Sequence, residues 1–306
     1  MTDVFVAAKA SPMYVNALKE HHTLHTTIDA DNAPRIRAIA GGGESKIPAD
    51  VIGSLPALEV ISVMGVGYDG VDVAAAKARG VMVTHTPDVL NDDVADLAIG
   101  LMLCAARQLP AADRYVRAGE WEKAPMPLAR KMSGARLGLV GMGRIGQAIA
   151  QRAGAFGMQI AYTARTPKPQ LGYAFHRNVV DLARESDFLV VITPGGAATR
   201  HMIDREVMKA LGAKGILVNV ARGSVVDEAA LIDALEQGVL GGAALDVFED
   251  EPRVPQRLRE LPQVVLTPHV GSATAQTRKA MVDLAMANLA AQLAGGRPPA
   301  PVPECR

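Results

Sequence analysis

Three residues that follow short apolar runs have the side chains needed to reduce a ketone. Arg222 follows "ILVNVA", Glu251 lies in "LDVFEDEP" and His269 follows "VVLTP". A histidine can donate a proton to a carbonyl oxygen near neutral pH, and a neighbouring glutamate favours the charged ring and orients it. An arginine can hold a carboxylate through two N–H groups and polarise the carbonyl. Each residue alone has a simpler explanation as a surface charge or a structural group, but the set predicts reduction of a 2-oxo acid if a hydride donor binds nearby.

A glycine-rich segment predicts that donor. The stretch "RLGLVGMGRIGQAIA" places Gly141, Gly143 and Gly146 in a G-x-G-x-x-G pattern between an apolar strand and a helix. The first glycine permits a tight turn, the second lets a pyrophosphate approach the backbone, and the third lets the helix pack closely on the strand. The helix start then offers free N–H groups and a partial positive charge to phosphate. An ordinary tight turn is the alternative; the strand before it and the helix after it favour dinucleotide binding.

The segment "IAYTARTPKP", Ile160–Pro169, lacks the acid that usually binds the ribose of NAD. Thr163 is followed instead by Arg165 and Lys168, with the hydroxyl of Thr166 between them. An acid would repel a 2′-phosphate, whereas an arginine can bind it with two N–H donors. Two bases on a solvated loop are the simpler alternative, but next to the glycine loop they predict NADP(H) as the coenzyme.

The elements that position these residues are short β-rich runs alternating with helical patterns, which indicates an α/β fold with parallel sheets buried on both faces. Two such series predict two doubly wound domains, a flavodoxin-like substrate domain and a Rossmann nucleotide-binding domain. We expect residues 1–98 with 285–306 to form the first domain and 99–284 the second. One long helix from Asp93 to about Gly119 separates the two series, and a final helix near Thr277–Leu293 is expected to return to the first domain. The Gly- and Pro-rich tail after it is assigned no structure.

The composition is that of a globular protein, and the charges balance. The chain has 306 residues, 49% of them hydrophobic and 21% charged, with 32 bases and 32 acids. No net field therefore favours nucleic acid or an anionic membrane. Two cysteines far apart in sequence, no secretory signal at the start and no apolar run long enough to span a bilayer predict a cytoplasmic protein.

The motifs "GMGRIG", "NVARGSVVDEAAL", "LDVFEDEP" and "TPHVGS" resemble those of the D-isomer-specific 2-hydroxyacid dehydrogenase family, and the resemblance covers nearly the whole chain. It implies that Arg222, Glu251 and His269 are the catalytic residues. It also implies that Asp246 lies near the carboxamide of the nicotinamide.

The resemblance extends to the first domain. "VMGVGYDGVD" is similar to the family's substrate loop, which implies that the N–H groups of Val66 and Gly67 receive the substrate carboxylate as an anion-binding nest. "TPDVLNDDVADLAIGLML" resembles the hinge into the second domain and implies that Val94 lies near the nicotinamide. Asn91 stands where threonine is more usual, so the contact at that position stays open.

Within the family, "ARTPKP" and the hinge segment look most like the NADPH-preferring glyoxylate, hydroxypyruvate and hydroxyphenylpyruvate reductases. The resemblance implies a homodimer built around the nucleotide domains, in which the region after Trp121 reaches the partner in some relatives. We expect no regulatory C-terminal domain. The residues expected to bind the coenzyme are Val94, Gly141, Gly143, Arg144, Ile145, Gly146, Ala164, Arg165, Thr166, Lys168, Val220 and Asp246. Those expected to bind the substrate are Val66, Gly67, Arg222 and His269.

Two alternatives stay open. One is the same chemistry on hydroxyphenylpyruvate or another bulky 2-oxo acid, because the sequence does not give the width of the pocket. The other is a nucleotide-sensing binding protein, like the family's transcriptional corepressors, although the intact Arg, Glu and His weigh against this. The physiological substrate and the direction of the reaction are not given by the sequence.

Two further clusters receive no functional assignment. His21, His22 and His25 in "EHHTLH" include a one-turn spacing suited to metal ligands, but no carboxylate or cysteine cluster completes a site. We interpret them as a solvated helix end and assign no metal. "GGGESK", Gly41–Lys46, lacks the spacing of a phosphate-binding P-loop and is interpreted as a loop at a strand end.

Overall fold

Two parallel sheets form the framework of the chain, one in each of two units. The computed structural model describes residues 1–306. Unit 1 comprises Met1–Leu90 and Ser272–Arg306, and unit 2 comprises Asn91–Gly271. The boundaries expected from the sequence, at 98/99 and 284/285, fall inside the helices α4 and α11, whereas the units divide just before each of these helices begins.

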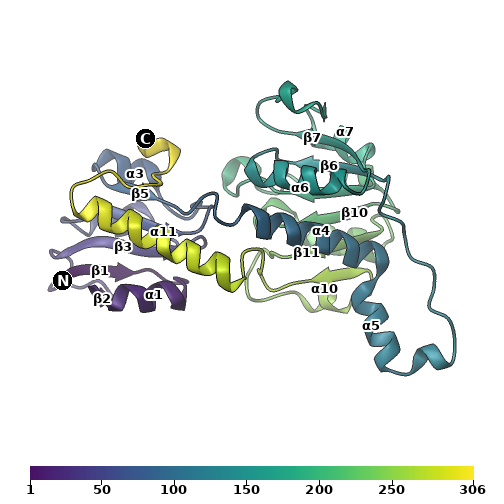
Figure 1. The fold of residues 1–306 in the computed structure, drawn as a ribbon, viewed down its shortest axis with the longest axis horizontal. Coiled ribbons are helices and arrows are strands. Elements are labelled where there is room, and N and C mark those ends of the chain that lie inside the picture. The colour runs from purple at the N-terminus through teal and green to yellow at the C-terminus, as the bar shows by residue number, and fades with distance from the viewer. The chain divides into compact units, whose positions relative to one another are not determined.

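The sheet of unit 1 has five strands in the order β2-β1-β3-β4-β5, all parallel (Figure 1). The order reverses beside β1, and right-handed crossovers therefore place α1 on one face and α2 and α3 on the other. Helix α11 packs against α1 and β4, so the last long helix returns to the first unit as predicted. The elements of unit 1 are β1 (Thr2–Val6), α1 (Pro12–Lys19), β2 (His22–His25), β3 (Ile36–Gly42), α2 (Ala49–Gly53), β4 (Val60–Met64), α3 (Val73–Ala78), β5 (Met82–Thr84), α11 (Ala275–Leu293) and η5 (Pro303–Cys305).

The sheet of unit 2 has seven parallel strands in the order β12-β11-β10-β9-β6-β7-β8. Helices α4 and α6 pack together on one face, and α7, α8 and α9 form a row on the other. The elements of unit 2 are α4 (Asn91–Arg107), α5 (Leu109–Arg117), η1 (Glu120–Glu122), β6 (Arg136–Val140), α6 (Arg144–Gly154), β7 (Gln159–Thr163), η2 (Pro169–Leu171), β8 (Ala174–Phe175), α7 (Val179–Arg184), β9 (Phe188–Val191), η3 (Ala197–Thr199), α8 (Arg205–Leu211), β10 (Ile216–Asn219), η4 (Gly223–Val225), α9 (Glu228–Glu236), β11 (Gly242–Leu245), α10 (Gln256–Glu260) and β12 (Val264–Leu266).

Both strand orders are those of doubly wound sheets, so the predicted fold class is confirmed. The strand order of unit 1 is flavodoxin-like, and that of unit 2 is a Rossmann order extended by one strand. The central strands β4, β9, β10 and β11 are buried along their whole length. This explains why they appear in the sequence as continuous rather than alternating apolar runs.

The long helix expected from Asp93 to Gly119 is instead two helices. The chain breaks at Gln108, which has a left-handed conformation with φ 52°, between α4 and α5. Pro110 explains the break, because a proline has no N–H group and its ring clashes with the carbonyl one turn earlier. No single helix is long and apolar enough to cross a membrane; only α4 and α5 together have that length and composition, across a 58° bend.

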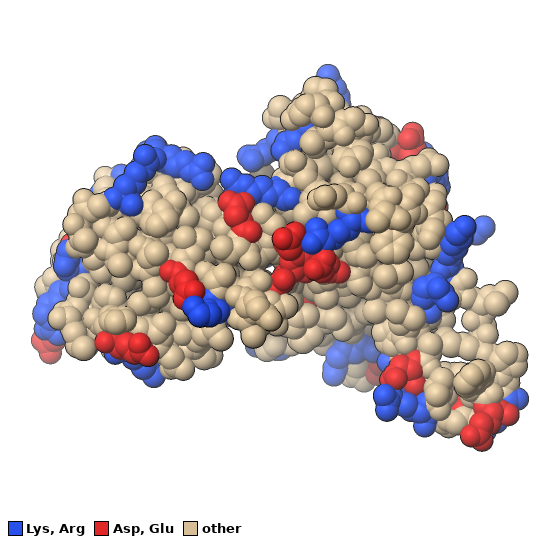
Figure 2. Space-filling model, in the orientation of Figure 1, with Lys and Arg blue, Asp and Glu red and all other residues tan.

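The histidine-rich segment is a strand and not the expected helix end. His22–His25 forms β2, which pairs in parallel with β1, and His25 Nε2 lies 2.7 Å from Asp3 Oδ1 on that neighbouring strand. Figure 2 shows side chains of both signs on the visible face of the molecule, with Lys or Arg beside Asp or Glu at several places. This agrees with the balance of charges in the sequence.

The tail also departs from expectation, because it is docked on unit 1. Pro301 forms an antiparallel bridge with Thr84 at the edge of β5, and the N–H group of Val302 donates to the carbonyl of Val83 at 2.9 Å. Val302 is fully buried. Asn288 of α11 joins the two segments: its amide nitrogen donates to the carbonyl of His85, and its oxygen accepts from the N–H group of Ala300.

Candidate active site

The glycine loop has the geometry that the motif requires. Gly141 has φ 112°, which side chains rarely tolerate, and a Cβ atom there would lie 2.6 Å from the carbonyl oxygen of Ile192. A Cβ atom on Gly146 would lie 2.4 Å from the carbonyl oxygen of Gly141, so this glycine lets helix α6 meet the loop. Gly143 is different, because a Cβ atom added to it would have no other atom within 4 Å. The loop is therefore packed on its inner side and open at Gly143.

Helix α6 begins directly after Gly143 without a side-chain cap and without an acid in its first turn. Its first N–H groups are thus not neutralised by the chain's own carboxylates. Such a helix start favours an anion. Among the other residues expected to contact the coenzyme, Arg144 is exposed at the start of the helix and Ile145 is half-buried beside it.

The loop that carries the two cations adjoins the glycine loop. The N–H group of Gly141 donates to the carbonyl of Thr163 at 3.0 Å, at the end of β7. Arg165 stands two residues later and is exposed, and its side chain forms no ion pair within the chain. The N–H group of Lys168 donates to the hydroxyl of the buried Tyr162 at 2.6 Å. A buried tyrosine thus fixes a loop on which Ala164, Arg165 and Thr166 lie next to the phosphate-binding turn.

A buried amide shapes the turn that carries Arg222. Asn219 ends β10 and is 1% exposed. Its side-chain oxygen accepts from the N–H group of Ala221 at 3.1 Å, and its nitrogen donates to the carbonyl of Arg222 at 3.0 Å. Val220, expected near the coenzyme, lies in the same turn and is nearly buried, with its N–H group donating to the carbonyl of Val191. The last residue of β10, Asn219, therefore fixes the turn that carries Arg222.

The turn after Arg222 packs on the turn that holds Glu251. A Cβ atom on Gly223 would lie 1.9 Å from the carbonyl carbon of Phe248, so only glycine fits. The N–H group of Phe248 donates to Glu251 Oε1 at 2.9 Å. Two of the three predicted catalytic residues are thus carried by backbone turns in direct contact.

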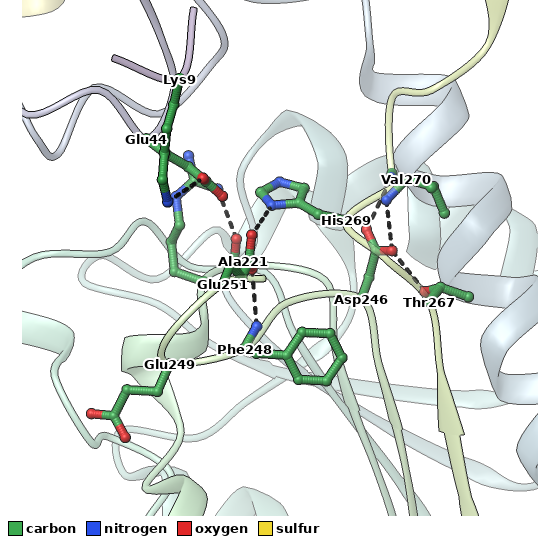
Figure 3. A network of polar contacts seen from close by, with 12 residues as sticks. Lys9, Glu44, Ala221, Asp246, Phe248, Glu249, Glu251, Thr267, His269 and Val270 are labelled. Carbon is green, nitrogen blue, oxygen red and sulfur yellow. Dashed lines mark hydrogen bonds and ion pairs between the residues drawn. The ribbon is translucent and has the colours of Figure 1, made fainter. Parts of the chain in front are cut away.

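Glu251 and His269 are brought together as predicted. Nδ1 of His269 lies 2.8 Å from Glu251 Oε2, as Figure 3 shows. Because Oε1 of Glu251 accepts from Phe248, the carboxylate is held at both oxygens. The contact with the carboxylate uses Nδ1, and Nε2 is the ring nitrogen that can carry the proton of a general acid.

Asp246 lies on the other side of His269 from Glu251 (Figure 3) and is 2% exposed. Its Oδ1 accepts from the hydroxyl of Thr267 at 2.7 Å and from the N–H group of Val270 at 2.8 Å. Its Oδ2 accepts from the N–H group of Gly271 at 2.8 Å. The neighbouring Val94 of α4 is buried, and a Cβ atom on Gly271 would touch it at 3.4 Å.

The predicted substrate loop of unit 1 follows β4. The carbonyl of Val66 lies 3.0 Å from Nδ1 of the buried His85, and the N–H groups of Val66 and Gly67 donate to no other group of the chain. A Cβ atom on Gly65 would lie 3.0 Å from Cα of Gly43, so this loop abuts the loop after β3. Both N–H groups can therefore donate to an anion, as an anion-binding nest requires.

Three residues that support the site were not predicted from the sequence: Asn219, Thr267 and His85. Asn219 carried a signal, because it is a polar residue at the end of an otherwise apolar strand. Thr267 and His85 had no such signal in the sequence. Thr267 binds Asp246, which is far from it along the chain, and His85 contacts the carbonyl of Val66 in a loop whose position is set by packing.

The comparisons with known proteins agree on one family. Residues 99–271 match the family model described as D-isomer specific 2-hydroxyacid dehydrogenase, NAD binding domain. The chain is 53% identical to glyoxylate/hydroxypyruvate reductase A of Arabidopsis thaliana, over 85% of this chain and 83% of that protein. It is 51% identical to a hydroxyphenylpyruvate reductase of Plectranthus scutellarioides, over 86% and 84% of the two chains.

A solved structure is similar over nearly the full length. The crystal structure of an NADPH-dependent glyoxylate/hydroxypyruvate reductase from Sinorhizobium meliloti, in complex with NADP and malonate, has a TM-score of 0.94 and 45% sequence identity. The match covers 99% of this chain and 97% of that one.

The geometry of the glycine loop predicts opposite outcomes for two similar substitutions. Gly143→Ala places a methyl group in open space, so we expect an unchanged midpoint of thermal unfolding but at least tenfold weaker dinucleotide binding. Gly146→Ala pushes a methyl group against a backbone oxygen, and overpacking of this kind costs about 1–3 kcal/mol. We therefore expect its midpoint to fall by several degrees. Thermal unfolding and fluorescence titration with NADPH measure both effects. A destabilised Gly143→Ala protein would contradict this assignment of the two glycines.

Proposed function

Because the chain belongs to the D-isomer specific 2-hydroxyacid dehydrogenase family, we propose that it uses NADPH to reduce a small 2-oxo acid of the glyoxylate or hydroxypyruvate class to the D-2-hydroxy acid. The observation that carries the chemistry is the 2.8 Å contact between His269 Nδ1 and Glu251 Oε2. The names of the similar glyoxylate/hydroxypyruvate reductases support the substrate class.

His269 is the proton donor in this proposal. The carboxylate of Glu251 accepts from Nδ1–H, which stabilises the imidazolium and leaves Nε2–H directed away from Glu251. The Nε2 proton passes to the carbonyl oxygen of the substrate, and the ring stays bound to Glu251 through Nδ1–H as a neutral imidazole. In the reverse direction Nε2 accepts the hydroxyl proton. Glu251 needs no movement for either step, because its other oxygen is held by Phe248.

Arg222 and the loop of unit 1 are assigned to the substrate's anionic group. The guanidinium of Arg222 holds the carboxylate and polarises the carbonyl, since it can donate two parallel N–H groups. In unit 1, the N–H groups of Val66 and Gly67 donate to no other group of the chain, which supports their assignment to substrate binding.

The residues of the nucleotide loop fit NADPH, which supplies the hydride when bound. Gly141, Gly143 and Gly146 with the start of α6 are assigned to the pyrophosphate. Arg165, Thr166 and Lys168 are assigned to the 2′-phosphate, because they follow a strand end that is hydrogen-bonded to the glycine loop. Val94, Val220 and Asp246 complete the assignment on the nicotinamide side.

A bulkier substrate is the second candidate, because the chain is almost as similar to a hydroxyphenylpyruvate reductase as to the glyoxylate/hydroxypyruvate reductase. A spectrophotometric comparison of glyoxylate, hydroxypyruvate and hydroxyphenylpyruvate, each with NADPH and with NADH, ranks the substrates by kcat/KM. NADPH binding without oxidation by any 2-oxo acid would favour a nucleotide-sensing binding protein instead.

We further propose a homodimer in the cytoplasm. Helix α5 has no buried residue, and Val116, Trp121 and Leu128 are 56%, 67% and 99% exposed. Three exposed large apolar side chains in one stretch of chain, residues 116–128, favour an interaction site there, and a second copy of the chain is the partner that the family resemblance implies. The free cysteines Cys104 and Cys305 support a reducing compartment.

Replacing His269 with Gln removes the donated proton while keeping a polar side chain of similar length. We expect kcat with the preferred 2-oxo acid to fall by about 10²–10⁴, the usual contribution of general acid catalysis. NADPH binding, measured by fluorescence, should stay within about twofold. His25→Gln is the control, because His25 pairs with Asp3 at the edge strand of unit 1 and has no role in the proposal. Unchanged turnover in His269→Gln would remove the proton-donor assignment.

The coenzyme preference is tested by Arg165→Glu. An acid at this position repels a 2′-phosphate and loses a charge-assisted hydrogen bond of about 1.5–3 kcal/mol, so the KM for NADPH should rise by about tenfold or more. The KM for NADH should change little. Arg184→Glu makes the same charge change on an exposed arginine of α7 that pairs with Asp181. Equal effects of Arg165→Glu on both coenzymes would show that Arg165 does not bind the 2′-phosphate.

The dimer is tested by light scattering coupled to gel filtration. The wild-type protein should have the mass of two chains, and Val116→Glu with Leu128→Glu should shift it towards one chain. Met13→Glu is the matched control, because Met13 is an exposed apolar residue on unit 1, 46% exposed. A wild-type protein that is monomeric at tens of micromolar would refute the proposed dimer.

A further inference from the structure

The carboxylate of Asp246 binds one short segment of the chain at three points. Its three donors, the hydroxyl of Thr267 and the N–H groups of Val270 and Gly271, lie within five consecutive residues. His269 stands at the centre of that segment. A buried carboxylate with three donors is an expensive group to desolvate, so its partners fix it firmly and are fixed by it.

The backbone of His269 needs this support. His269 has φ 52°, a left-handed conformation that is unfavourable for a residue other than glycine. Its N–H group donates to the carbonyl of Asp246 at 2.9 Å. Asp246 therefore holds the segment through its backbone at His269 and through its side chain on both sides of it. Strained conformations persist only where surrounding contacts determine them.

The packing around the segment leaves little freedom. Gly271 is buried, and a Cβ atom on it would lie 3.2 Å from Asp246 Oδ2. The segment is also the last part of unit 2 before the chain passes into unit 1 at Ser272. Asp246 thus fixes the point from which the His269 ring reaches Glu251.

We propose that Asp246 is a positioning residue for His269: its carboxylate holds the left-handed turn that places Nδ1 of His269 at hydrogen-bond distance from Glu251. This goes beyond the role that the family resemblance implies, a contact with the nicotinamide carboxamide. It rests on the proposed function in that His269 is taken as the proton donor. A misplacement of about 1 Å in such a group can cost about 10²-fold in rate.

Asp246→Asn is the first test, because it keeps the shape of the side chain but places an N–H₂ group against one of the three donors. We expect kcat at saturating NADPH to fall at least tenfold, a loss that a weaker coenzyme contact alone would not cause. The Kd for NADPH, from fluorescence titration, measures separately the nicotinamide contact that is assigned to the same carboxylate. In the coenzyme-free protein, the downfield Nδ1–H resonance of His269 bound to Glu251 should weaken or disappear. The protein has seven histidines, so His269→Gln identifies this resonance by its absence.

Thr267 supplies a matched pair of variants. Its hydroxyl donates to Asp246 Oδ1, and Thr267→Val removes that donor without changing the shape of the side chain. It should weaken the His269 resonance and lower kcat in the same direction as Asp246→Asn, by a smaller factor. Thr267→Ser keeps the hydroxyl and should restore both. A purely coenzyme-binding role of Asp246 predicts no effect of Thr267→Val on the resonance of the coenzyme-free protein.

If Asp246→Asn and Thr267→Val leave the His269 resonance and kcat unchanged while Asp246→Asn raises the Kd for NADPH, Asp246 acts only as a coenzyme ligand and the positioning role is wrong. If the wild-type protein reduces no 2-oxo acid, the proposed function fails. The resonance of the coenzyme-free protein then still decides whether Asp246 positions His269.

Discussion

The burial of both faces of a parallel sheet constrains everything else in unit 2. Its central strands have no exposed face, so polar side chains can be presented only where a strand ends. The glycine loop, Arg222 and His269 each follow the carboxyl end of a strand, and those ends meet at one edge because the strands are parallel. The strand order reverses between β6 and β9, beside the glycine loop, and open α/β sheets bind their ligands at such a reversal. The location of the site thus follows from the burial of the sheet on both faces.

The site itself is held by turns that bind one another. Asn219 shapes the turn of Arg222, Gly223 packs on Phe248, and the N–H group of Phe248 binds Glu251. Each link uses the backbone, so none of them occupies the side chains of Arg222 and His269, which are proposed to act on the substrate. Rigid support of this kind places reacting groups within a fraction of an ångström, which is where much of the rate of an enzyme originates.

Sequence patterns predicted the sheets, the glycine loop and the pairing of Glu251 with His269, because these depend on local periodicity and on strand ends. The break at Gln108 was not predicted, although Pro110 is a signal for it, since a proline cannot continue a helix. Strand β2 was misread because its support, the contact of His25 with Asp3, joins residues far apart in sequence. The three donors of Asp246 were not predictable for the same reason: their convergence is set by tertiary packing.

The docked tail has a consequence for solubility. Strand β5 lies at the margin of its sheet, where unpaired backbone groups can recruit a strand from another molecule. Residues Ala300–Val302 occupy that margin, and Pro301 and the following Pro303 have no N–H group that another strand could use. The segment therefore ends the sheet. It makes hydrogen bonds at the edge of β5, and its prolines lack the N–H donors that pairing with a strand of another molecule would need.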